Sequence, residues 1–149
     1  MWLIIGYGNP LRGDDGAGPL LAKKLANQLS AEQAKIIIAH QLTPELALEI
    51  VAAEIHSVLF IDVTRDQSTA SDISPLVPDA TGSCGHQATP QLLLQLAEQL
   101  YNRSVPGWLL TIAGENFSFA EQLSESTQRN SAAALRHAIE FIRNSKMLT

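Results

Sequence analysis

Short apolar runs alternate along this chain with longer segments of helical period, and no other feature constrains the fold as strongly. The runs are rich in Ile and Val, whereas the segments between them place apolar residues at three- and four-residue steps. This order is typical of a mainly parallel sheet, because parallel strands are joined by helical crossovers. The sequence therefore predicts an α/β three-layer sandwich with helices on both faces of a five-stranded sheet. The expected strands are residues 2–6, 35–39, 58–63, 73–77 and 108–113.

Several short signals set the expected helices and the edge of the sheet. Thr43-Pro44 and Thr89-Pro90 each combine an N-cap residue with a first-turn proline. Ser118-x-x-Glu121 has the spacing of a capping box. The weak strand at 73–77 is bounded by prolines, so we expect it at an edge of the sheet and antiparallel to its neighbour. The expected helices are residues 15–29, 44–53, 90–101 and 127–143, and the third should bury Leu92, Leu93, Leu96 and Leu100.

Composition narrows the class of protein. The 149 residues suit one domain, residues 1–149, and 46% of them are hydrophobic. Ten basic residues against fifteen acidic ones give a net charge of −5, which disfavours nucleic acid or an anionic membrane as partner. The single cysteine, Cys84, excludes a disulfide framework. The N-terminal apolar run is too short for a signal peptide, so we expect a cytoplasmic protein. Because the chain is one modest domain without an evident apolar excess, we expect a monomer.

A glycine-rich loop follows the first strand and is the first candidate site. Residues 6–18 contain five glycines, which allow tight turns and close approach of a ligand. The spacing is neither that of a Walker loop nor that of a dinucleotide fingerprint. Asp14 and Asp15 stand where the next helix begins and would repel a phosphate. One carboxylate suffices to cap a helix, so we assign that role to Asp14 and expect another task for Asp15.

Two further polar residues are expected near this loop. Asp62 ends an apolar strand, and the carboxyl ends of parallel strands meet at one edge of a sheet. His86 lies in a loop of small residues before the helix at 90–101. Each has a plain structural alternative, because Asp62 could cap a turn and His86 could be solvated. Together with Asp15, however, they form an O,O,N set that can hold a divalent cation with open positions. We interpret His40, His56 and His137 as structural or incidental and Cys84 as a bystander thiol.

The ordered set of motifs resembles the [NiFe]-hydrogenase maturation endopeptidases, which remove a C-terminal extension from the hydrogenase large subunit after nickel insertion. The resemblance spans most of the chain and implies that Asp15, Asp62 and His86 contact the metal. The motifs that carry it are Gly6-Tyr7-Gly8-Asn9, Leu11, Gly13-Asp14-Asp15-Gly16-Ala17-Gly18, Phe60-Ile61-Asp62, His86, Gly114-x-x-Phe117 and Leu123-Ser124.

The resemblance also implies a mechanism and a partner. The nickel would arrive on cysteines of the large-subunit precursor, and Asp15, Asp62 and His86 would probe it. Nickel or another divalent metal such as zinc could activate water for cleavage, and a carboxylate acting as general base is the competing account. The loops around the cleft, including residues 64–71, would contact the precursor in a protein–protein interface.

Two other functions stay open. Gly6-Tyr7-Gly8-Asn9-Pro10 also resembles the start of the peptidyl-tRNA hydrolases, which share a similar architecture. That family expects a histidine soon after the loop, whereas this chain has none until His40, and a net charge of −5 suits an RNA substrate poorly. A non-enzymatic, flavodoxin-like binding domain would instead hold an anion at the glycine loop and no metal between Asp15, Asp62 and His86.

Overall fold

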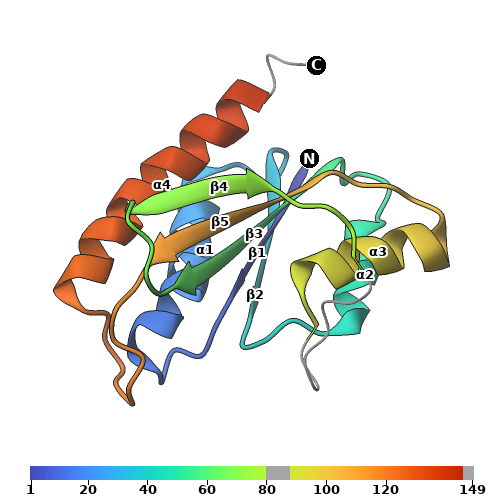
Figure 1. Cartoon of the computed structure of the whole chain (residues 1–149). Coiled ribbons are helices and arrows are strands. Elements are labelled where there is room, and N and C mark those ends of the chain that lie inside the picture. The colour runs from blue at the N-terminus through green and yellow to red at the C-terminus, as the bar shows by residue number, and fades with distance from the viewer. Residues whose placement is uncertain (80–87, 146–149) are drawn as a thin grey trace.

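The sheet has five strands, of which one edge strand runs against the others. The computed structural model describes residues 1–79 and 88–145. The strand order is β2-β1-β3-β5-β4, and only β4 is antiparallel to its neighbour (Figure 1). The mainly parallel sheet and its antiparallel edge strand are confirmed. The strands are β1 (Trp2–Tyr7), β2 (Ala34–Ala39), β3 (Ser57–Thr64), β4 (Ser71–Pro75) and β5 (Gly107–Ala113).

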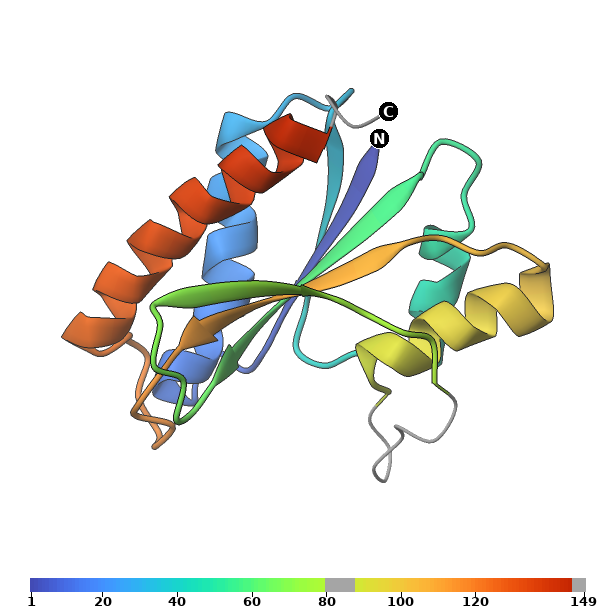
Figure 2. The same ribbon diagram turned by 45° about the horizontal axis from the view of Figure 1, so that its top comes forward.

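Helices cover both faces of the sheet, so the expected three layers are present. Helices α1 (Ala17–Gln28) and α4 (Glu125–Ser145) pack on one face, and α2 (Ala47–Ile50) and α3 (Pro90–Tyr101) pack on the other (Figures 1 and 2). The side chains of β1 alternate between the two faces of the sheet. Ile4 belongs to the hydrophobic core under α1 and α4, and Ile5 belongs to the core under α2 and α3. Burial on both faces explains why the sequence of this strand is apolar without alternation.

Helix α3 has the predicted bounds but a different buried face. The Thr89 hydroxyl accepts a hydrogen bond from the Leu92 N–H at 3.1 Å, as expected of an N-cap. The buried side chains are those of Pro90, Leu93, Leu94 and Ala97, whereas Leu100 is 66% exposed. The predicted stripe was therefore wrong in part. Leucines occupy two neighbouring rows of this helix, so hydrophobicity alone could not choose between them.

The first two helices begin or end at other residues than predicted. The first opens as a 3-10 turn, η1 (Gly13–Gly16), before α1. The second is a 3-10 turn, η2 (Pro44–Leu46), followed by the four residues of α2. Thr43 precedes Pro44 but caps no N–H group, because its side chain is hydrogen-bonded to that of Glu45.

The capping-box prediction at Ser118 was wrong. Its N–H and hydroxyl both donate to Asn116 Oδ1, and no helix starts there. Helix α4 begins at Glu125, and the Ser124 hydroxyl before it accepts the Thr127 N–H at 3.3 Å. Strand β4 likewise lies two residues earlier than predicted, because Ser71 and Asp72 pair with β5 along an exposed edge that tolerates polar side chains. Within residues 1–79 and 88–145, no helix is long and apolar enough to cross a membrane.

Candidate active site

The glycine-rich loop bends over the carboxyl end of β1 and fixes Asp15. Gly8 has φ +147°, and a Cβ atom there would lie 2.0 Å from the carbonyl oxygen of Asp15, so only glycine fits. The Asn9 N–H donates to Asp15 Oδ2 at 2.6 Å. The loop therefore holds this half-buried carboxylate at the edge of the sheet.

Asp14 has a different role from the one predicted. Its buried carboxylate accepts hydrogen bonds from the N–H groups of Glu115, Asn116 and Ser124 at 2.7–2.9 Å, and from the Ser124 hydroxyl. It caps neither η1 nor α1. Burial acts to raise its pKa, but these hydrogen bonds outweigh burial and lower the pKa to about 2. Asp14 thus ties the glycine loop to residues 115–124.

Asp62 lies next to Tyr7 on the neighbouring strand, because β1 and β3 are paired in parallel. Burial raises the pKa of Asp62, and the negative charge of Asp15 adds to this increase. Hydrogen bonds from the Val63 N–H, at 2.7 Å to Oδ1, and from the Tyr7 hydroxyl act in the opposite direction. Burial and the charge of Asp62 together raise the pKa of Tyr7, so this phenol stays protonated and donates to the carboxylate.

Replacing Tyr7 by phenylalanine should raise the pKa of Asp62 in the metal-free protein. The Tyr7 hydroxyl stabilises the ionised carboxylate, so its loss favours the protonated form. A titration of the Asp62 carboxyl carbon by NMR measures the change directly. Tyr101→Phe is the matched control, because this tyrosine lies at the end of α3 and away from Asp62. An unchanged or lower pKa in Tyr7→Phe would contradict the proposed hydrogen bond.

The two carboxylates share one small cavity. Asp15 and Asp62 both line it, its volume is about 200 Å³, and it opens at the carboxyl ends of β1 and β3. The charge of Asp15 contributes to the raised pKa of Asp62, which shows that the two groups interact. The structure therefore brings together two of the three residues singled out in the sequence. The other lining residues are Tyr7, Gly8, Arg12, His40, Gln41, Leu42 and Ala88.

The third residue, His86, and Cys84 lie outside the described residues. In the part of the chain that the structure describes, no group of three or more His, Cys, Asp or Glu side chains is arranged to hold a metal ion. His137 lies elsewhere and is hydrogen-bonded to the Ser71 hydroxyl at 2.9 Å. The described residues thus supply two carboxylates to a cation, and the nitrogen ligand stays a prediction.

Sequence reasoning missed Tyr7 and His40. Tyr7 was treated only as part of the glycine-rich loop motif, whereas its position beside Asp62 follows from the pairing of β1 with β3. His40 was interpreted as incidental, yet it lines the same cavity as Asp15. Its place directly after β2 was the available signal, since β2 also ends at this edge of the sheet.

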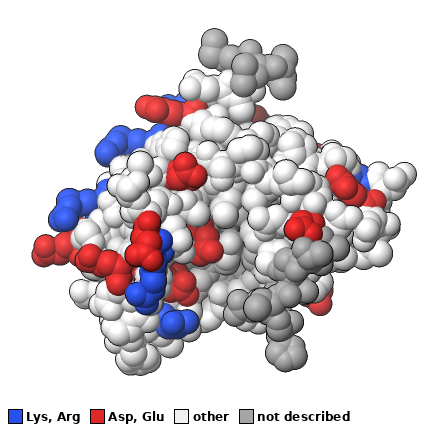
Figure 3. All heavy atoms as spheres, in the orientation of Figure 1, with Lys and Arg blue, Asp and Glu red and all other residues white. Residues whose placement is uncertain are grey.

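The loop at residues 64–71 lies beside this edge and is held in place. The Gln67 side chain exchanges hydrogen bonds with Thr111, at 2.6 Å to its hydroxyl and 3.1 Å to its carbonyl oxygen. Arg65 stacks over Phe117 at 4.4 Å from the ring centre. On the face seen in Figure 3, basic side chains stand beside acidic ones. Local contacts, rather than a broad field of one sign, would therefore determine what binds on this face.

The solved structures to which this chain is similar include hydrogenase maturation proteases. No known family model matches the chain, and neither does any curated protein sequence. The structure is similar to that of the [NiFe] hydrogenase maturation protease HycI from Thermococcus kodakarensis KOD1, with a TM-score of 0.73, 18% identity, and coverage of 95% of this chain and 92% of that one. For the hydrogenase maturating endopeptidase HybD from Escherichia coli the TM-score is 0.71 at 18% identity, covering 97% and 93% of the two chains. A hydrogenase 2 maturation peptidase from Thaumarchaeota archaeon SCGC_AB-539-E09 gives 0.66 at 22% identity, covering 95% and 97%. The chain has the fold of these proteins.

Proposed function

We propose that this chain is a [NiFe]-hydrogenase maturation endopeptidase, which removes a C-terminal extension from a nickel-loaded large-subunit precursor. One observation carries the proposal: Asp15 and Asp62 line the same cavity at the carboxyl edge of the sheet. The shared fold with named maturation proteases agrees with it. The same two charges disfavour a flavodoxin-like anion site at the glycine loop, because they would repel the anion.

Asp15 and Asp62 would bind the nickel as cargo of the substrate. Two carboxylates in one small cavity repel each other, which is part of the reason that the pKa of Asp62 is raised. A divalent cation offsets this repulsion, so a precursor that brings nickel should bind better than one that does not. Oxygen and imidazole ligands suit nickel and zinc. Zinc or another divalent metal is therefore the alternative occupant of the site.

His86 is the proposed third ligand. Ala88 lines the cavity, and it follows His86 by two residues in the chain. Since consecutive Cα atoms are about 3.8 Å apart, the two Cα atoms are separated by at most about 7.6 Å. An imidazole on residue 86 is therefore close enough along the chain to be a candidate partner for the two carboxylates.

The chain's own residues would also act in the cleavage. A bound divalent cation supplies positive charge that polarises the scissile carbonyl group. Asp62 is a half-buried carboxylate with a raised pKa, which suits a group that accepts a proton from the attacking water. The Tyr7 hydroxyl would hold that carboxylate in place through its hydrogen bond.

The decisive experiment compares two forms of the cognate precursor. The purified protein is mixed with nickel-loaded or nickel-free large-subunit precursor, and the shortened product is followed on a gel. We expect cleavage of the loaded form alone. Cleavage of neither form would contradict the proposed function, and cleavage of both would contradict recognition of the nickel.

A further inference from the structure

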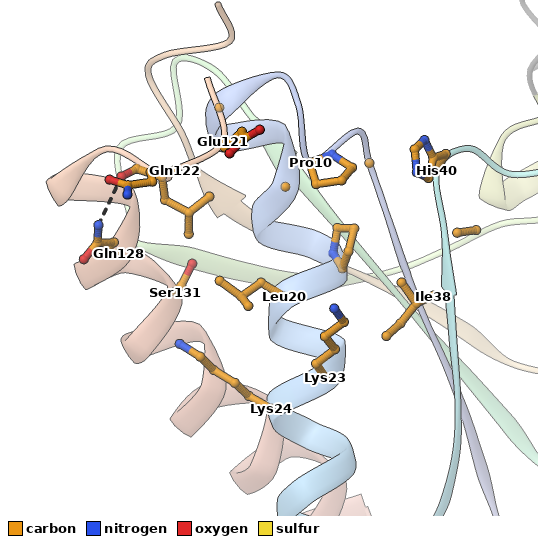
Figure 4. A pocket seen from close by; sticks show the side chains of 16 residues that line it. Pro10, Leu20, Lys23, Lys24, Ile38, His40, Glu121, Gln122, Gln128 and Ser131 are labelled. Carbon is orange, nitrogen blue, oxygen red and sulfur yellow. Dashed lines mark hydrogen bonds between the residues drawn. The ribbon is translucent and has the colours of Figure 1, made fainter. Parts of the chain in front are cut away.

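A second, larger hollow adjoins the cavity that contains Asp15 and Asp62. Its volume is about 740 Å³, and on one side it is bounded by α1 and β2 (Figure 4). Gly8 and His40 line both hollows, so the two lie next to each other. We call the part between α1 and β2 the β2 groove; it is lined by Gly8, Pro10, Pro19, Lys23, Ile38 and His40.

Strand β2 presents backbone hydrogen-bonding groups at its outer edge, beside this groove, that pair with none of the residues that the structure describes. Strand β2 is at the edge of the sheet and pairs with β1 alone. The Trp2 N–H donates to the Gln33 carbonyl and the Gly8 N–H to the Ala39 carbonyl, so odd-numbered residues of this segment face β1. Because peptide groups alternate along a strand, the N–H and C=O groups of Ile36 and Ile38 point away from the sheet. No residue within 1–79 or 88–145 pairs with those groups, so they can pair with another strand.

Strand β2 has few of the sequence features that prevent an edge strand from pairing with a strand of another chain. It contains no proline, and its one charged residue, Lys35, is paired with Glu49 at 2.7 Å. Ile38 is 45% exposed on the groove side. An uncovered edge with an exposed branched apolar side chain is a template for an added strand.

Lys23 supplies charge beside this edge. Pro19 and Lys23 are four residues apart on α1, so they form a row on the β2 side, whereas Leu20 and Lys24 form the next row, toward α4 (Figure 4). Lys23 is exposed and makes no ion pair with any residue that the structure describes. A free ammonium group above an apolar strand favours an acidic group in the occupant.

We propose that the β2 groove binds an extended segment of the protein substrate, which adds to the sheet as a strand next to β2. The segment carries an apolar side chain against Ile38 and, at an alternate position on the same face, an acidic side chain toward Lys23. This inference rests on the proposed function and names the surface that guides the substrate toward Asp15 and Asp62. The residues that line both the groove and the cavity of Asp15 and Asp62, together with the charge of Lys23, favour the substrate as the occupant.

Two matched pairs of variants test the backbone and charge contacts. Ile38→Pro removes the outward N–H and no hydrogen bond to β1, whereas Ile38→Ala keeps the N–H and shortens the side chain. We expect Ile38→Pro to raise the KM for nickel-loaded precursor about tenfold and Ile38→Ala less than threefold, both with kcat nearly unchanged. Lys23→Glu should raise KM about tenfold, whereas Lys24→Glu, with the same charge change one residue away, should raise it less than threefold. A folded Ile38→Pro with wild-type KM, or equal effects at the two lysines, would overturn the proposal.

A measurement on the unaltered protein covers the case in which Ile38→Pro does not fold. The probe is a synthetic peptide spanning the cleavage site of the cognate precursor, and the readout is amide hydrogen exchange. We expect the peptide to slow exchange at Ile36 and Ile38, but not at Ile37, whose N–H already faces β1. Unchanged exchange at Ile36 and Ile38 would overturn the proposal, as would protection of both in a dimer without peptide, which would make a second copy the occupant.

The results also separate this inference from the proposed function. Cleavage of the precursor without amide protection and with wild-type KM in the folded variants contradicts the groove alone. No cleavage of any precursor, combined with protection at Ile36 and Ile38, contradicts the protease function and leaves strand addition supported. No cleavage and no protection contradict both.

Discussion

Asp15→Asn and Asp62→Asn should each reduce kcat/KM for nickel-loaded precursor on the order of a thousandfold, because both carboxylates line the shared cavity. Each change removes one of two negative charges that would hold the substrate's nickel. Asparagine keeps the shape of the side chain, so the fold should persist. Cleavage rates from a gel time course measure the loss, and thermal unfolding followed by circular dichroism checks the fold. We expect the same loss for His86→Ala.

The matched control for these variants is Asp72→Asn. Asp72 is an exposed carboxylate on the edge strand β4; it lies two strands across the sheet from Asp62, since Thr111 of β5 pairs with both residues, and it does not line the cavity. The Asp72→Asn variant loses the same charge as the cavity variants but should cleave the precursor at the wild-type rate. Full activity of both cavity variants would refute the assignment of the site, and equal losses in Asp72→Asn would show that overall charge matters instead.

Asp14→Ala should lower the free energy of unfolding by about 3 kcal/mol. The buried carboxylate accepts four hydrogen bonds from Glu115, Asn116 and Ser124, and alanine leaves those donors without their acceptor. Urea denaturation at pH 7 measures the loss. Asp72→Ala removes an exposed carboxylate and should change the free energy by less than about 0.5 kcal/mol. A loss below 1 kcal/mol in Asp14→Ala would contradict this role.

The contribution of Asp14 should also depend on pH in a defined direction. Its pKa is lowered from 3.8 to about 2 in the folded protein, so the ionised form favours folding. The stabilisation is complete above pH 4 and is lost as the pH falls toward 2; about 2 kcal/mol is involved. The difference in free energy of unfolding between the wild type and Asp14→Ala should therefore narrow between pH 4 and pH 2. A constant difference over this range would contradict the lowered pKa.

The strands and layers could be predicted because their signals are local and strong. The apolar runs of β1 and β3 are buried on both faces, so burial and sequence agree residue by residue. The Thr89-Pro90 signal also suffices to place the start of α3. At the start of α4, by contrast, the chain offers two similar serine motifs. The choice of Ser124 over Ser118 is made by Asp14, a residue about 110 positions away in the chain.

Of the candidate site, too, one part could be predicted from the sequence and another could not. The general geometry of parallel strands is enough to bring Asp15 and Asp62 to one edge, and the structure places them in one cavity. The roles of the adjacent Asp14 and Asp15 depend on which way each peptide of the loop turns, and Asp14 proved to brace residues 115–124 rather than cap a helix. Tyr7 could not be identified as the partner of Asp62, because its neighbour on β3 depends on the strand order and register, which the sequence does not give.

The hydrogen bonds between the Asp14 carboxylate and residues 115–124 have a consequence for synthesis of the protein. The loop that presents Asp15 is made early by the ribosome, but the groups that anchor it emerge about a hundred residues later. A nascent or truncated chain that ends before Glu115 lacks those anchors. Such a fragment can contain all the strand residues, but its Asp15 loop is not anchored. The proposed proteolytic activity should therefore arise only when translation nears its end.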